Sequence, residues 1–154
     1  MRILFATDGS QQSNAALEKI GLLRLGSGDE IRVVSIIDMA LPLTVDIYGG
    51  FVPDTTELEK AAKENADRVI TEATAALRSK FADESPTVEG EVLFGSPDSR
   101  IVETAQEWNA DLIVVGSHGY GRLERLLLGS VSDSVIHHAP CSVLVVRAKH
   151  EETR

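Results

Sequence analysis

Two short segments bring glycines together with polar side chains that suit a phosphorylated small molecule. The first is Thr7-Asp8-Gly9-Ser10. Its carboxylate could accept hydrogen bonds from a ribose diol or ligate Mg²⁺ through oxygen. The alternative is structural, because Asp8 or Ser10 could cap the helix that follows. If Asp8 lies near phosphates, then Mg²⁺, the side chain of Arg122 or the distance to the ribose must offset the repulsion between the negative charges.

The second segment, residues 116–132, predicts a cradle for phosphate. Gly116 and Gly119 let the backbone turn sharply and approach a ligand closely, since neither carries a Cβ atom. Gly129 precedes a helix, and the first amides of that helix would point outward at the positive end of the helix dipole. Those amides belong to Ser130, Val131 and Ser132, and the hydroxyls of the two serines add further donors.

Neither segment matches a standard phosphate motif, and neither contains a complete catalytic set. No lysine follows Gly129 as a Walker loop requires, and the first strand is not followed by Gly-x-Gly-x-x-Gly. Ser117 and His118 are adjacent but lack the Gly-x-Ser-x-Gly pattern of a nucleophile elbow. His118 could contact a phosphate or act as a base. We therefore expect binding with at most slow hydrolysis, and we assign no catalytic residue.

The elements that must position both segments alternate between strands and helices. Apolar runs and period-2 patterns predict strands, and apolar residues at helical spacing predict helices. The predicted strands are residues 2–7, 30–38, 87–94, 112–115 and 142–146. The predicted helices run from residue 13 to Gly26, over 54–81, from 95–98 onward and over 130–138. Strand 87–94 is expected to be half buried, with Val88, Val92 and Phe94 as its apolar positions.

This alternation predicts an α/β fold with one doubly wound, five-stranded parallel sheet in the order 3-2-1-4-5. Such a sheet is Rossmann-like or flavodoxin-like, with helices on both faces. The winding reverses between strands 1 and 4, and ligands bind in the crevice at the carboxyl ends of those strands. Residues 7–10 and 116–119 lie at those two strand ends. The topology therefore brings the two chemically distinctive segments to one crevice.

Composition excludes several classes of protein. The chain has 154 residues, 43% of them hydrophobic, and predicts one domain over residues 1–148 with a short polar tail at 149–154. A net charge of −9 disfavours nucleic acid and anionic membranes as partners. One cysteine excludes an intrachain disulfide framework, and no apolar run reaches the roughly 18 residues of a membrane span. Asp8 comes too early for a signal sequence, so we expect a cytoplasmic protein.

The last predicted strand, Ser142–Val146, would form an edge of the sheet although it is apolar on both faces. An uncovered apolar edge invites aggregation, so we expect something to cover it. The simplest cover is the same strand of a second copy, which predicts an isologous homodimer.

The spacing Gly116-x2-Gly119-x9-Gly129-Ser130 resembles the signature of ATP-binding members of the universal stress protein family. One position departs from the family pattern, since some nucleotide-binding members have proline where this chain has Ala6. Further segments extend the resemblance over essentially the whole chain, namely Ile3-Leu4-x-x-Thr7-Asp8, Ser35-Ile36-Ile37-Asp38, Gly95-x-Pro97 and Pro140-x-x-Val143-Leu144-Val145-Val146.

The resemblance implies that the chain binds ATP, or AMP or ADP, with Mg²⁺ accompanying the nucleotide, and that it forms a homodimer. It implies that Asp8 approaches the ribose or the metal, and that Ile36 and Val115 border the adenine. It also implies that Gly116, Gly119, Gly129, Ser130 and Val131 wrap the phosphates. With the neighbouring residues, the expected binding set is Ala6, Thr7, Asp8, Ile36, Val115, Gly116, His118, Gly119, Arg122, Gly129, Ser130, Val131 and Ser132.

We therefore expect a nucleotide-responsive stress regulator, in which ATP orders residues 39–53 and 119–128 and changes what the dimer binds. Two alternatives remain open. One is a small phosphotransferase or hydrolase that uses Asp8 or Ser117 in the same crevice. The other is a pure interaction protein whose crevice stays empty.

Overall fold

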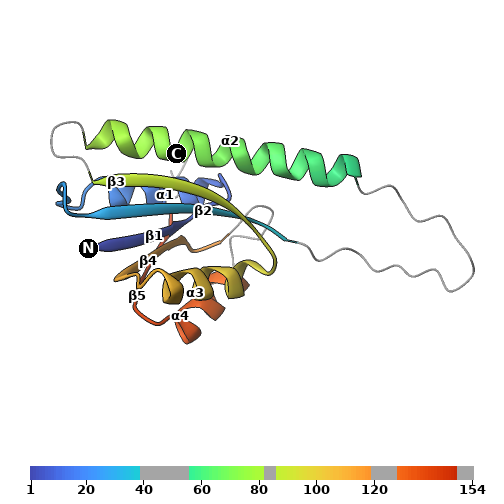
Figure 1. Cartoon of the computed structure of the whole chain (residues 1–154). Helices are drawn as coiled ribbons and strands as arrows, with labels where there is room; N and C mark the ends of the chain where they lie inside the picture. Colours follow the sequence, from blue (N-terminus) through green and yellow to red (C-terminus); the bar gives the residue numbers. More distant parts are fainter. Residues whose placement is uncertain (39–55, 82–85, 119–127, 149–154) are drawn as a thin grey trace, which may run out of the picture.

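Five segments rich in aliphatic residues form one parallel sheet in the computed structural model (Figure 1). The strands are β1 Arg2–Ala6, β2 Glu30–Ile37, β3 Thr87–Phe94, β4 Leu112–Gly116 and β5 Ser142–Val146. Their order is β3-β2-β1-β4-β5, which confirms the predicted topology. The structure describes residues 1–38, 56–81, 86–118 and 128–148.

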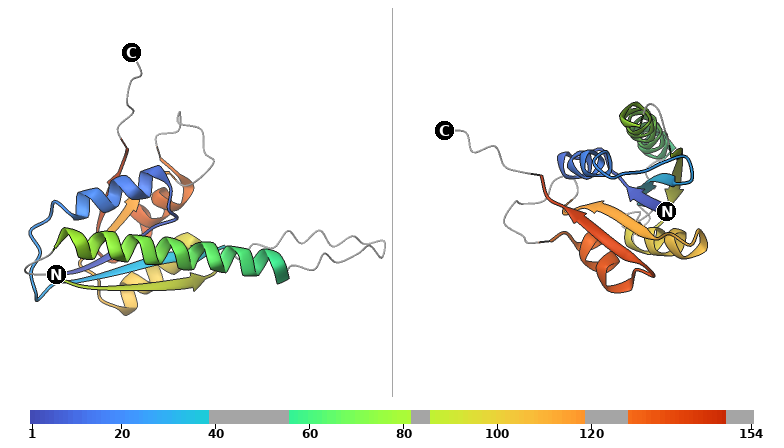
Figure 2. Two further views of the ribbon diagram at one scale, coloured as in Figure 1. Left: turned by 90° about the horizontal axis from the view of Figure 1, so that it is seen from above. Right: turned by 90° about the vertical axis from the view of Figure 1, so that its left-hand side faces the viewer.

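Helices cover both faces of this sheet (Figure 2). Helices α1 (Gln11–Ile20) and α2 (Thr56–Lys80) pack on one face, and α3 (Pro97–Glu107) and α4 (Ser130–His138) pack on the other. Strand β1 lies between β2 and β4, and its successive side chains enter the two cores in turn. Ile3 and Phe5 face α1 and α2, whereas Leu4 faces α3 and α4. This burial on both faces fixes the carboxyl end of β1.

The end of α1 differs from the sequence prediction. Helix α1 ends at Ile20, not near Gly26. The amides of Leu22 and Leu23 bond to carbonyls three residues back, which tightens the chain into turns and stops the α-helix. Leu23 nevertheless packs against the core, which is why its helical spacing was misleading.

The buried side of β3 also differs from the prediction. Val88 is buried as expected, but Phe94 is 49% exposed and Leu93 is buried instead. Val88 packs in the core beneath α2, whereas Leu93 packs in the core beneath α3. The strand therefore changes the face it buries along its length, so a single alternating pattern could not describe it.

The remaining expectations concern the rest of the chain. The predicted start of the second helix at Asp54, the segment 39–53 that ATP is expected to order and the tail at 149–154 lie outside the described residues. None of the helices that the structure describes is both long enough and apolar enough to cross a membrane.

Candidate nucleotide-binding crevice

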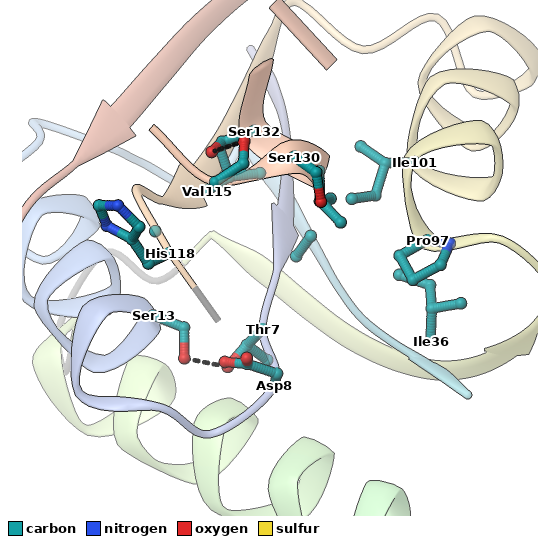
Figure 3. Close-up of a pocket in the computed structure, with 14 residues that line it drawn as sticks. Thr7, Asp8, Ser13, Ile36, Pro97, Ile101, Val115, His118, Ser130 and Ser132 are labelled. Carbon is teal, nitrogen blue, oxygen red and sulfur yellow. Dashed lines mark hydrogen bonds between the residues drawn. The ribbon is translucent and has the colours of Figure 1, made fainter. Parts of the chain in front are cut away.

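A cavity of about 200 Å³ opens at the carboxyl ends of β1 and β4, where the winding of the sheet reverses (Figure 3). All the expected binding residues that the structure describes line this cavity, and Gly119 and Arg122 lie outside the described part of the chain. Sequence reasoning missed Ser13, Pro97 and Ile101. The complete lining is Ala6, Thr7, Asp8, Ser13, Ile36, Pro97, Ile101, Val115, Gly116, His118, Gly129, Ser130, Val131 and Ser132.

The turn from β1 to α1 is held by buried hydroxyls. Ser10 is the N-cap of α1, and its Oγ accepts a hydrogen bond from the amide of Ser13 at 3.3 Å. The Oγ1 of Thr7 donates to the Oγ of Ser13 at 3.1 Å. Asp8 Oδ1 accepts from the amide of Ser10 at 2.9 Å, and the Asp8 side chain stays exposed at the cavity. Ser10, not Asp8, therefore caps the helix, which leaves the carboxylate of Asp8 at the cavity wall.

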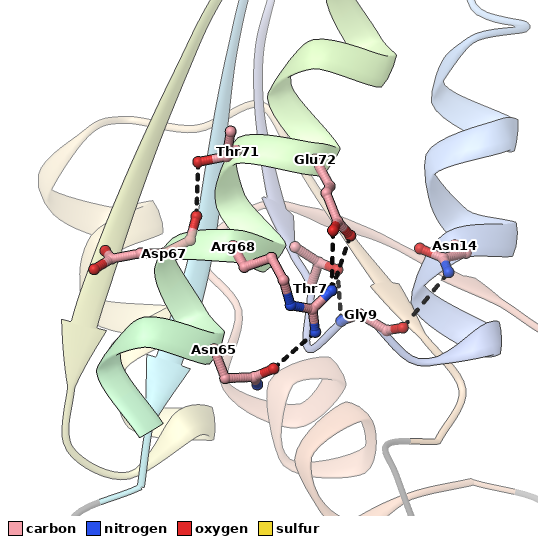
Figure 4. A network of polar contacts seen from close by, with 8 residues as sticks. All are labelled: Thr7, Gly9, Asn14, Asn65, Asp67, Arg68, Thr71 and Glu72. Carbon is pink, nitrogen blue, oxygen red and sulfur yellow. Dashed lines mark hydrogen bonds and ion pairs between the residues drawn. The ribbon is translucent and has the colours of Figure 1, made fainter. Parts of the chain in front are cut away.

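Helix α2 supports the same turn from behind (Figure 4). Gly9 has φ +75°, and a Cβ atom there would lie 2.9 Å from Cγ2 of Val69. The amide of Gly9 donates to Thr7 Oγ1 at 3.2 Å. On the adjoining turn of α2, Arg68 bonds to both carboxylate oxygens of Glu72, at 3.0 and 3.1 Å. The positive φ of residue 9 and its closeness to Val69 both require glycine at this position.

The opposite wall is the N-terminus of α4. The amide of Gly129 donates to the carbonyl of Ser117 at 2.7 Å. The amide of Asp133 makes the first helical bond, to the carbonyl of Gly129. The three amides between them precede that bond and have no carbonyl within the helix to accept them. We expected both Ser130 and Ser132 to offer hydroxyls to a ligand, but the Oγ of Ser132 is buried 3.0 Å from the Ser117 carbonyl.

Ser117 and His118 form a chain of hydrogen bonds with Gln12. The amide of Ala148 donates to Oε1 of Gln12, so that atom must be the amide oxygen. Ser117 Oγ lies 3.2 Å from the same oxygen and 3.0 Å from His118 Nδ1, and its one proton can be donated to either atom. Ser117 is 2% exposed and is not among the residues that line the cavity, which argues against a nucleophilic role for its hydroxyl.

The third side of the cavity is apolar and ends at β2. Ala6, Ile36, Val115, Pro97 and Ile101 supply its walls. Strand β1 pairs with β2 only as far as Val34, whose carbonyl accepts from the amide of Thr7 at 2.9 Å. Because backbone groups alternate in direction along a strand, the amide and carbonyl of Ile36 face the same side as those of Val34. They therefore lie beyond the last pair of the β1–β2 ladder, beside the cavity.

Among the residues that line this cavity, Asp8 is the one with an acidic side chain. Among the residues that the structure describes, no group of three or more His, Cys, Asp or Glu side chains could hold a metal ion. Mg²⁺ is commonly bound by one or two carboxylates together with phosphate oxygens of the substrate. The donor set therefore fits a Mg²⁺ ion that arrives with a polyphosphate, with Asp8 as its protein ligand.

The match to a known family extends over most of the chain. The model of the universal stress protein family matches residues 1–147. The chain belongs to the universal stress protein family. A universal stress protein of Staphylococcus aureus (strain USA300) is 33% identical over 148 residues, covering 96% of this chain and 84% of the relative.

Several solved structures share the fold. The hypothetical protein MJ0577 superposes with a TM-score of 0.81 at 27% identity, covering 97% of each chain. A universal stress protein in complex with cAMP has a TM-score of 0.64 at 23% identity, covering 96% of each chain. A family member from Arabidopsis thaliana with AMP bound has a TM-score of 0.68 at 16% identity, covering 100% of this chain and 95% of its own.

Proposed function

We propose that this universal stress protein binds an adenine nucleotide in the cavity between β1 and β4, with ATP as the preferred ligand and AMP or ADP in the same place. The observation that carries the proposal is the N-terminus of α4. Its first amides line the cavity, and a Cβ atom at Gly129 would lie 3.0 Å from the Ser117 carbonyl and 3.3 Å from Cα of His118. The fold neighbours with bound cAMP and AMP support an adenine nucleotide.

The two ends of the cavity suit the two ends of a nucleotide. The walls made by Ala6, Ile36 and Val115 are apolar and would take the base. The amide and carbonyl of Ile36 offer one donor and one acceptor, which match N1 and the amino group of adenine. The amides of Ser130 and Val131, with the Ser130 hydroxyl, would receive phosphate at the positive end of the α4 dipole.

Mg²⁺ would accompany the triphosphate, held by Asp8 and by phosphate oxygens. A divalent cation between the Asp8 carboxylate and the phosphates would neutralise both and so remove their mutual repulsion. His118 and Arg122 remain the expected side-chain contacts to the phosphates.

We favour a nucleotide-responsive regulator over an enzyme. Ser117 is buried and does not line the cavity, so its hydroxyl is not placed to attack a bound phosphate. A turnover assay with ATP that compares the wild type with Asp8→Ala tests the alternative. Turnover that requires Asp8 would replace the regulator with a phosphotransferase or hydrolase.

The protein would act in the cytoplasm as a homodimer joined through β5. This strand is an edge of the sheet, and Val143, Leu144 and Val145 are only partly buried by the chain itself. A second copy of β5 would cover both the open hydrogen-bonding edge and these side chains. Sedimentation velocity should give twice the mass of the 16.6 kDa chain, and a monomer at micromolar concentration would contradict this assembly.

Titration calorimetry tests the ligand directly. ATP with Mg²⁺ is expected to bind, AMP and cAMP to bind more weakly, and FMN not to bind. Gly129→Val should abolish ATP binding, because its side chain would fill the space between α4 and Ser117. Gly28→Val is the matched control, since a Cβ atom at Gly28 meets nothing within 4 Å. ATP binding retained by folded Gly129→Val, or preference for FMN in the wild type, would refute the proposal.

A further inference from the structure

Three serines spaced two apart along α4 serve different purposes. Ser130 is exposed at the cavity, and Ser132 is buried with its Oγ 3.0 Å from the Ser117 carbonyl. Ser134, outside the cavity lining, donates to Oδ2 of Asp98 on α3 at 2.8 Å. Residues two positions apart in a helix are separated by about 200° around its axis. Ser132 and Ser134 therefore anchor opposite sides of α4. The N-terminal half of the helix is thus tied both to Ser117, just after β4, and to α3.

The carboxylate of Asp98 accepts hydrogen bonds in its ionised form. It lies in the first turn of α3, where a negative charge is stabilised by the helix dipole. Its Oδ1 accepts from Ser96 Oγ at 2.6 Å, while Oδ2 accepts from Ser134. Hydrogen bonds from Ser96 and Ser134 hold the pKa of Asp98 below its ordinary value, so the carboxylate is ionised at neutral pH. Hydrogen bonds to ionised acceptors are shorter and stronger than neutral ones.

We propose that Asp98 and Ser134 form a positioning pair that holds the N-terminus of α4 in the orientation needed to receive phosphate. The inference rests on the proposed function, because it assigns a purpose to the phosphate end of the same cavity. Asp98 is not part of the cavity wall. Its carboxylate accepts hydrogen bonds from Ser96 and Ser134 and does not face the ligand. The pair acts through α4, not by touching the nucleotide.

Loss of the pair should change one end of the cavity only. The base end is formed largely by Ala6, Ile36 and Val115, which are parts of the sheet and are held by its ladders. The phosphate end depends on α4, which would lose its hydrogen bond to α3 while keeping its hydrogen bonds to Ser117 and the core packing of Val131 and Val135. The affinity for ATP should therefore fall while the affinity for adenosine, which lacks phosphate, should stay unchanged.

The test is calorimetry of ATP with Mg²⁺ and of adenosine against wild type, Ser134→Ala, Asp98→Ala and the double variant. Each single variant should weaken ATP about tenfold, on the scale of one charge-assisted hydrogen bond, and change adenosine less than about twofold. The double variant should be no weaker than the worse single one, because both remove the same bond. Ser134→Thr, which keeps the hydroxyl, should restore ATP affinity. Ser99→Ala is the matched control, since it removes an exposed hydroxyl from the same turn of α3.

The outcomes separate the two proposals. A wild type that binds neither ATP nor adenosine defeats the proposed function and this inference with it. A wild type that binds both, with variants whose ratio of ATP to adenosine affinity is unchanged, defeats the positioning pair alone. Hydrogen exchange of the ligand-free protein gives a second measure: the amides of Ser130–Ser132 should exchange faster in Ser134→Ala than in Ser99→Ala. Equal exchange in the two variants would also overturn the inference.

Discussion

The two ends of the central strands are built on opposite principles. At the amino end, long charged side chains close over the sheet. Arg2 donates from its amide to Asp111 and from its guanidinium to the carbonyl of Trp108, and the Trp108 ring lies 4.5 Å from the guanidinium carbon of Arg32. At the carboxyl end, glycine, serine and alanine leave a cavity of about 200 Å³.

The difference lies in where the backbone amides find partners. At the amino end, the amide of Asp111 donates to the carbonyl of Arg2 while the Asp111 side chain accepts from the Arg2 amide, so β1 and β4 begin as a closed unit. At the carboxyl end, the first amides of α4 lack helical acceptors and line the cavity. One end of the sheet pairs its polar groups with one another, and the other leaves the first residues of α4 beside an open cavity.

Trp108→Ala should give the largest change and should separate the two ends. Removing the indole empties the half-buried space between α3 and Arg32, and the free energy of unfolding should fall by about 3 kcal/mol. ATP affinity should stay within about twofold, since Trp108 is outside the cavity lining. Urea unfolding and calorimetry on the same samples measure both quantities.

Trp108→Phe is the control for that change, because it keeps an aromatic ring for the Arg32 guanidinium to stack on. It should recover most of the lost stability. A Trp108→Ala protein that stays folded but loses ATP binding would contradict the separation of the two ends.

The alternation of strands and helices in the amino-acid sequence favoured the sheet order that the structure has. Buried apolar runs separated by helical patterns leave few topologies, and the winding reversal then locates the crevice next to Asp8 and Gly116. Trp108 packs against the core under α3 and α4. The arginine stacked on it was not foreseen, since Arg32 comes from a distant strand.

What the sequence could not predict depends on contacts between distant elements. Pro97 and Ile101 reach the cavity because α3 packs beside α4, and no local pattern encodes that distance. The bond from Ser117 to Gln12 joins residues 105 apart, so no local pattern indicates it. The position of Ser132 on its helix was predicted, but the use of its hydroxyl inside the protein required the Ser117 carbonyl to be in place.

The smallest expected effect concerns acid stability at the carboxyl end. The folded protein lowers the pKa of Asp98, chiefly through the hydrogen bonds from Ser96 and Ser134, below its ordinary value of 3.8. A lowered carboxyl pKa adds stability above the ordinary value, and that contribution is lost as the pH falls through the pKa of the folded protein. Asp98→Asn cannot gain this proton. Wild type should therefore be more stable than Asp98→Asn by about 1 kcal/mol at pH 7, and the difference should persist to about pH 4 and shrink below it.

Urea unfolding between pH 7 and pH 3 measures the difference in stability between wild type and Asp98→Asn, with Ser99→Ala as a pH-independent control. A difference that disappears between pH 7 and pH 5 would show that a group other than Asp98 governs the acid response of the α3–α4 contact.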